Sequence, residues 1–177
     1  MLPTLLRTQR LVLREPRPED AALIFEAYTQ DMDVARYMVW RPHKTLRQTK
    51  NFIEGCINRW ESNQSRPYIL ALAEREDVPI GMLDALVFSH TVDIGYVLGR
   101  QYWGAGLMPE AIVAFCDAAL ALPDYFRIQA TCDTENLPSA RTLEKSGFKR
   151  EGRLERYIVH PNLGHEPRAS FMYSRCK

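Results

Sequence analysis

The feature that most constrains this chain is a strand that runs through a glycine-containing turn directly into a helix. The strand is predicted over Asp93 to Leu98, the turn contains Gly104 and Gly106, and an apolar helix follows from Pro109 to about Leu122. A helix N-terminus leaves backbone N–H groups unpaired and carries partial positive charge. Glycines just before it let a ligand approach the backbone. The segment therefore predicts an anion site, above all for phosphate.

Two familiar phosphate-binding motifs do not fit this turn. A P-loop requires Lys and Ser or Thr after its last glycine, whereas Gly106 is followed by Leu-Met-Pro-Glu. The dinucleotide fingerprint requires a third glycine in a parallel unit, and the strands before this turn are predicted to be antiparallel hairpins. Taken by itself, the turn is equally compatible with a structural turn that binds nothing.

The rest of the chain mixes strands and helices without a linker or an internal repeat. Further strands are predicted over 10–14, 68–73, 79–88 and 127–132, and a late hairpin over 154–159 and 169–173. Helices are predicted from Pro18, after an N-cap at Thr45, and over 137–145 with Gly147 as C-cap. An irregular loop is expected around 38–42. This pattern predicts an α+β (mixed α/β) fold in one domain, residues 1–177.

Charge and cysteine content narrow the classes of function. The 23 basic and 22 acidic residues leave a net charge of +1, which argues against a nucleic-acid partner. There is no run of 18 apolar residues and no signal-peptide pattern at the N-terminus, so no membrane partner is expected. The four cysteines form no C-x-x-C motif, which predicts reduced thiols, no metal site and a cytoplasmic location.

Three segments occur in an order that resembles a known family. They are Ile94 to Leu98, Tyr102 to Gly106 with Glu110-Ala111 after it, and Glu135 to Phe148. They resemble the GCN5-related N-acetyltransferase (GNAT) superfamily, and more closely its branch of ribosomal-protein alanine/serine N-acetyltransferases. The opening Thr8–Arg14 and the late Arg150–Arg153 are similar to the same branch. The resemblance covers about residues 7 to 175.

The resemblance implies a fold, a cosubstrate and a reaction. The fold is a central mixed, mostly antiparallel sheet of about seven strands flanked by about four helices, with a V-shaped split between strands 4 and 5. Acetyl-CoA would lie in the split, and its acetyl group would pass directly to a primary amine, either a protein N-terminus or a small molecule. A monomer or a homodimer is expected. The alternative is a non-catalytic module that binds or senses acyl-CoA.

The resemblance also implies the residues that bind the cofactor. Main-chain groups of Val97 and Leu98 would pair with the pantetheine arm, and backbone amides from Gln101 through Met108 would hold the pyrophosphate. Gly104 and Gly106 would be glycines because a Cβ would collide with the phosphates. Asn136 would bond the cofactor or act only as a helix cap, and Arg141 would reach a phosphate or lie at the surface. The implied cofactor-binding residues are Val97, Leu98, Gln101, Trp103, Gly104, Ala105, Gly106, Leu107, Met108, Asn136 and Ser139.

The reaction needs a neutral amine, donors for an oxyanion and a proton for the departing thiolate. Backbone N–H groups of Val97 or Leu98 would serve the oxyanion. Many relatives supply the proton from a tyrosine in L-Y-x-K-x-G-F, which this chain lacks, so Ser139 is the predicted donor; otherwise it is a solvated serine. Asp93 is the predicted base, or else an ordinary strand-start acid. His90 and Asp84 are weaker candidates for the base.

The acceptor is the least constrained part of the prediction. The branch commonly has Trp-Arg-Asp before its last strand, whereas this chain has Pro167-Arg168-Ala169, which puts ribosomal-protein specificity in doubt. Five side chains between the first two helices are candidates for contacting the acceptor, or else pack partly against the sheet. They are Tyr37, Met38, Trp40, Arg41 and His43.

Overall fold

The computed structural model describes residues 1–63 and 65–177 and is built on one eight-stranded sheet. The strand order is β1-β2-β3-β4-β5-β6-β8-β7, and every neighbouring pair is antiparallel except β5 and β6. The strands are β1 (Leu6–Arg7), β2 (Leu11–Arg14), β3 (Ser65–Leu72), β4 (Arg75–Phe88), β5 (Thr91–Leu98), β6 (Arg127–Asp133), β7 (Lys149–Ile158) and β8 (Arg168–Cys176). The mixed, mostly antiparallel sheet predicted from the sequence is confirmed.

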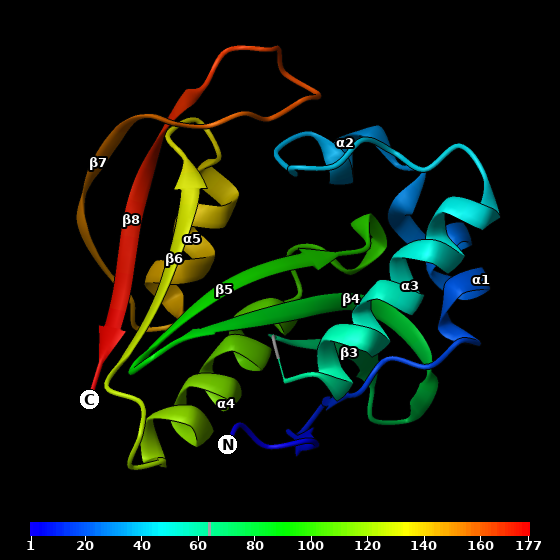
Figure 1. The fold of residues 1–177 in the computed structure, drawn as a ribbon, viewed down its shortest axis with the longest axis horizontal. Coiled ribbons are helices and arrows are strands. Elements are labelled where there is room, and N and C mark those ends of the chain that lie inside the picture. Colours follow the sequence, from blue (N-terminus) through cyan, green and yellow to red (C-terminus); the bar gives the residue numbers. More distant parts are fainter. Residues whose placement is uncertain (64) are drawn as a thin grey trace.

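The parallel pair β5 and β6 is joined only at its beginning. Thr91 to Asp93 pair with Arg127 to Gln129, and beyond this point the two strands diverge (Figure 1). The remaining length of β5, up to Leu98, therefore has no strand on that side. When the two-residue β1 is set aside, the split lies between the fourth and fifth of seven longer strands, as expected.

Helices cover both faces of the sheet. They are α1 (Asp20–Ile24), which continues as a π-helical turn (Phe25–Thr29), α2 (Met32–Ala35), α3 (Leu46–Glu61), a 3-10 turn (Arg100–Tyr102), α4 (Leu107–Ala121) and α5 (Leu137–Lys145). On one face, α1 and α3 pack against Ile69 and Met82. On the other, α4 and α5 pack around Phe115 and Leu143 in the larger core.

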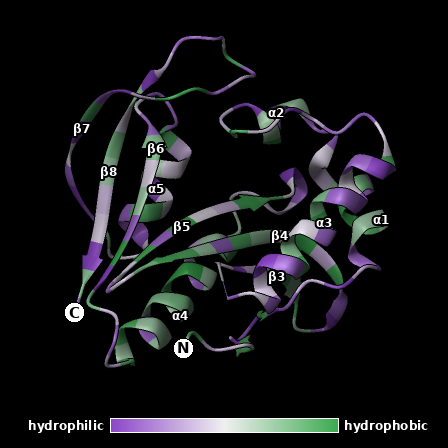
Figure 2. Cartoon of the chain, viewed as in Figure 1, coloured by the Kyte–Doolittle hydropathy of each residue, from purple (hydrophilic) through white to green (hydrophobic). Residues whose placement is uncertain are grey.

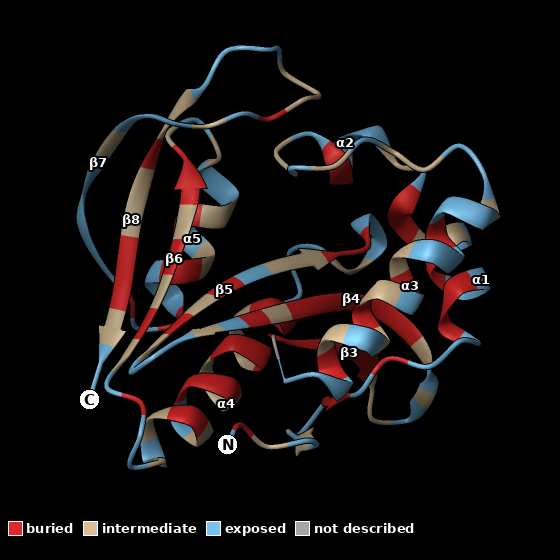
Figure 3. Ribbon diagram, viewed as in Figure 1, coloured by how far each residue is buried: buried red, intermediate tan, exposed pale blue. Residues whose placement is uncertain are grey.

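Local sequence explains where these helices begin. Thr45 is the N-cap of α3 in a capping box with Gln48, as predicted. Helix α4 is largely apolar and buried (Figures 2 and 3), which matches its predicted place in the core. It begins at Leu107, two residues before the expected Pro109. Pro109 fits inside the first turn because the backbone N–H groups there have no intrahelical acceptor, so the N–H that proline lacks is not needed.

Two short elements were not predicted. Strand β1 pairs its two residues with Val12 and Leu13, and α2 forms one turn capped by the Asp31 carboxylate. Neither is long enough to show periodicity in the sequence. In the part of the chain that the structure describes, no helix is long and apolar enough to cross a membrane.

Candidate functional site

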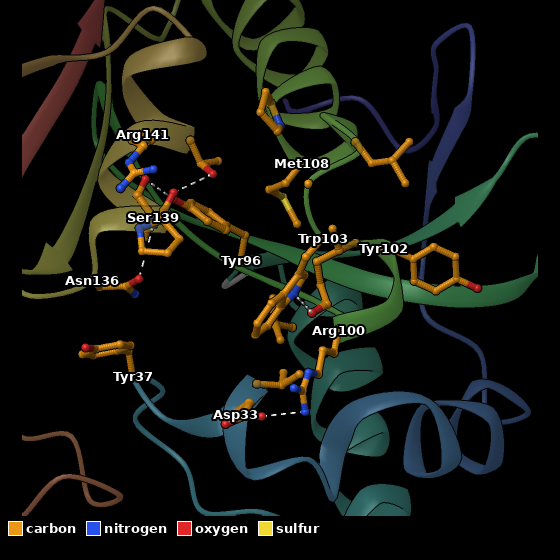
Figure 4. A pocket seen from close by; sticks show the side chains of 18 of the residues that line it. Asp33, Tyr37, Tyr96, Arg100, Tyr102, Trp103, Met108, Asn136, Ser139 and Arg141 are labelled. Carbon is orange, nitrogen blue, oxygen red and sulfur yellow. Dashed lines mark hydrogen bonds and ion pairs between the residues drawn. The ribbon is translucent and has the colours of Figure 1, made fainter.

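A cavity of about 620 Å³ opens where β5 and β6 diverge. Its walls come from α2 and the loop after it, the end of β5, the glycine turn with the start of α4, and one face of α5 (Figure 4). The volume is in the range of small-molecule and cofactor sites. Nine of the predicted cofactor residues line it: Val97, Leu98, Trp103, Gly104, Gly106, Leu107, Met108, Asn136 and Ser139. Gln101 and Ala105 do not line it, and both are exposed.

The glycine turn owes its glycines to backbone conformation. Gly104 has φ +77° and Gly106 has φ +73°, a left-handed region that costs other residues roughly 1–2 kcal/mol. A Cβ built at Gly104 would meet no protein atom within 4 Å, so that position is open toward the cavity. The structure thus gives a conformational reason for both glycines, while the steric reason expected from bound phosphates stays a prediction.

A polar network braces this turn from the N-terminal segment. Arg10 donates to the Glu110 carboxylate at 2.6 Å and to the Ala105 carbonyl at 2.9 Å. The Thr8 hydroxyl reaches the same carboxylate at 2.5 Å. Burial works to raise the pKa of Glu110, but the hydrogen bonds from Thr8 and Arg10 outweigh it and lower that pKa. The turn is therefore held in shape without any ligand.

The free edge of β5 presents backbone groups to the cavity. The N–H of Gly99 donates to Ile80 on the β4 side at 2.8 Å. Because successive residues of a strand direct their backbone groups to opposite edges, the N–H groups of Leu98 and Tyr96 face the open side. The Leu98 carbonyl already accepts a 2.8 Å hydrogen bond from the Trp103 indole. Of the two residues predicted to face the cofactor, Leu98 is thus the one whose N–H is free there.

Ser139 and Tyr96 form a hydroxyl pair across the cavity wall. Their oxygen atoms are 2.8 Å apart, which joins α5 to β5 (Figure 4). The Asn136 side chain accepts from the Ser139 N–H at 3.3 Å, so Asn136 is the N-cap of α5 as well as a lining residue. Burial raises the pKa of Tyr96 and the Ser139 hydrogen bond opposes this rise. At neutral pH both hydroxyls are protonated, and when Tyr96 donates to the Ser139 oxygen, the Ser139 O–H is left to donate into the cavity.

The structure does not bring the predicted base to the cavity. Asp93 lies four residues before Val97, about 13 Å along the strand at ~3.3 Å per residue, and its carboxylate accepts from Gln129 at 3.0 Å. Burial raises its pKa, and the bond from Gln129 opposes this. Its role as base stays a prediction. Of the weaker candidates, Asp84 is paired with Arg59 at 2.6 Å and His90 is exposed in the β4–β5 turn.

Two loops meet over the wide end of the split. The Asn162 side chain, between β7 and β8, donates to the carbonyls of Ala35 at 2.6 Å and Trp40 at 2.8 Å. Tyr37 donates to the Glu135 carbonyl at 3.4 Å. These bonds join the N-terminal and C-terminal arms above the cavity.

The five predicted acceptor-side residues divide between two spaces. Tyr37 and Met38 line the large cavity, and Trp40 and His43 line a second, much smaller one. Arg41 lines neither. Ala169 stands where the resemblance implies an acid, and Arg168 before it pairs with Asp133 at 2.6 Å.

Several lining residues were not predicted from the sequence. Tyr96 could have been found, because it lies inside the motif Ile94–Leu98 that carried the resemblance. No local pattern in the sequence indicates that four charged side chains also line the cavity. They are Asp33, Arg36, Arg100 and Lys145. Among the described residues, no group of three or more His, Cys, Asp or Glu side chains is placed to hold a metal ion.

Comparison with known proteins relates this geometry to a family. The model of the acetyltransferase (GNAT) domain matches residues 10–149. An uncharacterized N-acetyltransferase, p20 of Bacillus licheniformis, is 30% identical over 156 residues, which cover 86% of each chain. The ribosomal protein uS5-alanine N-acetyltransferase of Escherichia coli is 26% identical over 165 residues, covering 87% of this chain and 82% of the relative.

Solved structures share the whole architecture. A GNAT-family acetyltransferase from Bacillus anthracis superposes with a TM-score of 0.84 at 28% identity, covering 97% of this chain and 98% of that one. The microcin C7 self-immunity acetyltransferase MccE, solved with acetyl-CoA and AMP, has a TM-score of 0.86 at 19% identity, covering 96% and 94%. The second likeness extends to the fold alone.

Proposed function

The chain belongs to the GNAT family of acetyltransferases, and we propose that it transfers the acetyl group of acetyl-CoA to a primary amine. The observation that carries this proposal is the glycine turn, which opens onto the N-terminus of α4 beside the free edge of β5. Phosphate favours that helix end, and an amide-rich arm favours an unpaired strand edge. Acetyl-CoA has both chemical features in one molecule.

The cofactor would run along the cavity from the turn toward α5. Its pyrophosphate would lie on the backbone amides between Gly104 and Met108, and its pantetheine arm would pair with the N–H groups of Leu98 and Tyr96. Arg141 and Lys145 line the same cavity and supply positive charge for the phosphates, whereas Arg100 is already paired with Asp33 at 2.6 Å. This placement puts the thioester beside the hydroxyls of Ser139 and Tyr96.

The transfer is a direct attack by the amine nitrogen on the thioester carbon. A C–N bond forms and the C–S bond breaks, while the amine loses one proton and the departing thiolate gains one. An unperturbed thiol has a pKa near ~8.5, so a hydrogen bond from a neutral hydroxyl is sufficient help. Ser139, supported by Tyr96 at 2.8 Å, is the proposed donor to the sulfur.

A protein or peptide N-terminus is the acceptor we propose. An α-amino group has a pKa near ~8 and is partly neutral at pH 7, whereas a lysine near ~10 is seldom neutral. The acceptor would reach the thioester beside Tyr37 and Met38, which line the large cavity. The Escherichia coli relative, named for acetylating an alanine of a ribosomal protein, supports this acceptor class.

The test is an acetylation screen with the purified chain. Acetyl-CoA is supplied with peptides that begin in alanine or serine, with spermidine, with an aminoglycoside and with free amino acids, and release of thiol is followed together with the product mass. We expect acetylated peptide and one free CoA per product. Tight binding of acetyl-CoA with no turnover on any amine would instead identify a binding module.

A further inference from the structure

The second cavity lies behind β5, on the face covered by α1 and α3. It measures about 20 Å³, and its walls are Tyr28, Thr29, Trp40, His43, Phe52 and Val97. A space of this size holds about one water molecule if enough polar groups face it. The cavity is therefore small, and it is not purely apolar.

Two of the residues that line this cavity carry polar groups that can form a further hydrogen bond. The Tyr28 side chain is only 2% exposed, and its hydroxyl has no hydrogen-bond partner within the part of the chain that the structure describes. A buried hydroxyl in this situation normally bonds to an ordered water. His43 lies on another wall, and within the described residues only its Nδ1 has a hydrogen-bond partner.

The ring of His43 is held by its surroundings. Its Nδ1 is 2.8 Å from the Thr49 hydroxyl, which in turn is 3.3 Å from the Thr29 hydroxyl. The rings of Trp40 and Phe52 pack against it at centroid distances of 5.6 and 5.9 Å. When Nδ1 donates to Thr49, Nε2 carries a free lone pair, which makes it an acceptor of protons.

Val97 connects this cavity to the cofactor groove. Among the described residues it is the only one that lines both spaces. Its side chain packs with the core of the α1–α3 face, while the backbone next to it forms the free edge of β5. The small cavity thus adjoins the cofactor groove at Val97.

We propose that His43, acting through a water molecule held in this cavity by Tyr28, accepts the proton that the acceptor amine loses during acetyl transfer. The inference rests on the proposed function and adds to it a second candidate for the base, beside Asp93, which does not line the large cavity. Nothing in the sequence distinguished His43 from its aromatic neighbours, because Thr49 and Tyr28 are brought to it only by folding.

The proton balance of the step is simple. The ammonium of the acceptor gives one proton through the water to Nε2 of His43, and the neutral nitrogen then attacks the thioester. The CoA sulfur takes its proton from the Ser139 and Tyr96 pair, which is reprotonated from solvent. As the C–S bond breaks, the nitrogen loses its second proton to solvent, which matches the proton that the Ser139 and Tyr96 pair takes from solvent. His43 releases its proton to solvent after each turnover, so the overall reaction liberates one proton.

The surroundings of His43 favour the neutral imidazole that a base requires. Burial lowers its pKa from the ordinary value. The groups that face it across the cavity come from the turn after α1, from α3, from its own loop and from β5, and the described lining contains no charged side chain. Tyr28 is the only other titratable group among them, and burial raises its pKa. No acidic side chain in the described lining therefore stabilises the charged form of His43.

The first experiment compares His43→Asn with wild type, using a short peptide that begins in alanine. Asparagine keeps a partner for Thr49 but removes Nε2. We expect kcat/KM for the peptide at pH 7 to fall about 100-fold, the usual contribution of a general base, with acetyl-CoA affinity unchanged. His165→Asn is the matched control, because His165 is exposed in the β7–β8 loop. It should behave as wild type.

The pH profile separates a chemical role from a structural one. In wild type, kcat/KM should rise through the low pKa of His43 and stay level from pH 7 to the pKa of the peptide amine near ~8. In His43→Asn the rate should instead climb about tenfold per pH unit up to that amine pKa. Added imidazole should restore part of the lost rate. An identical profile in both proteins overturns the proposal.

Two further measurements keep the proposal open to refutation. Tyr28→Phe should lower kcat about tenfold without moving the acidic limb of the pH profile. Full wild-type activity in this variant would overturn the water relay.

Nitrogen-15 NMR of the free protein should show His43 neutral at pH 7 with the proton on Nδ1, and a proton on Nε2 would contradict the proposal. A wild-type protein that binds acetyl-CoA but acetylates no amine would refute the proposed function, and this inference with it.

Discussion

The two sides of the split are built in different ways. The cofactor side consists of backbone: two glycines with positive φ, the first amides of α4 and the open edge of β5. The acceptor side consists of side chains from distant segments, in which Asn162 bonds to Ala35 and Trp40. The contrast indicates a proposed cofactor half built from one continuous stretch of backbone and a proposed acceptor half assembled from side chains far apart in the sequence.

This difference has a functional meaning. A backbone surface recognises what is common to every turnover, the phosphates and amides of the donor. A side-chain surface can change while the fold stays the same, which suits a family whose members act on different amines. Substitutions on the two sides should therefore affect different kinetic constants.

The largest effect should come from breaking the cofactor side at its turn. Gly104→Val places a β-branched side chain at φ +77° and into the open space beside the amides. We expect acetyl-CoA affinity to fall at least 100-fold in a calorimetric titration. Gly152→Val is the control, because Gly152 is exposed on β7 and has no positive φ. Equal affinity in both variants would mean that the turn does not bind the donor.

A smaller effect is expected where the two sides meet. Ser139→Ala removes the proposed donor to the sulfur, and kcat should fall about tenfold to 100-fold while the affinity for acetyl-CoA changes little. Tyr96→Phe removes only the supporting hydroxyl and should cost less. Steady-state kinetics with varied acetyl-CoA measure both constants. If kcat stays within twofold of wild type in Ser139→Ala, Ser139 is not the donor.

Loosening the acceptor side should be milder still. Asn162→Ala removes both hydrogen bonds that hold the loop before α3, so the KM for a peptide acceptor should rise several-fold. Acetyl-CoA affinity should not change, because Asn162 does not line the large cavity. His165→Ala, an exposed change in the same loop, serves as the comparison. A rise in KM for acetyl-CoA instead would contradict the division between the two sides.

The smallest effect concerns the brace behind the glycine turn. Hydrogen bonds from Thr8 and Arg10 lower the pKa of Glu110, so its contribution to stability is present above its unfolded pKa near ~4.3 and is lost as pH falls through its folded value. Glu110→Gln should therefore reduce stability by about 1 kcal/mol at pH 7. Thermal unfolding should show the difference in stability between wild type and Glu110→Gln disappearing below pH 4. If this difference persists in acid, it comes from packing and not from the charge of Glu110.

The sequence predicted the cofactor half better than the acceptor half, for a physical reason. Gly104, Gly106, Asn136 and Ser139 are local signals, since a turn, a cap and a helix start depend on neighbours in the chain. The pairing of Ser139 with Tyr96, and of His43 with Thr49, depends on contacts that the sequence does not display. Gln101 and Ala105 were included because the whole turn was taken as one binding surface, whereas both are exposed outside the cavity.

The central claim is that the gap beside β5 binds acetyl-CoA through its own backbone. Calorimetric titration of the purified chain with acetyl-CoA, with CoA and with ATP as a phosphate control tests it directly. We predict that acetyl-CoA and CoA bind with one site per chain and that ATP binds far more weakly, because it lacks the pantetheine arm. Equal binding of all three, or no binding of acetyl-CoA, would contradict the account.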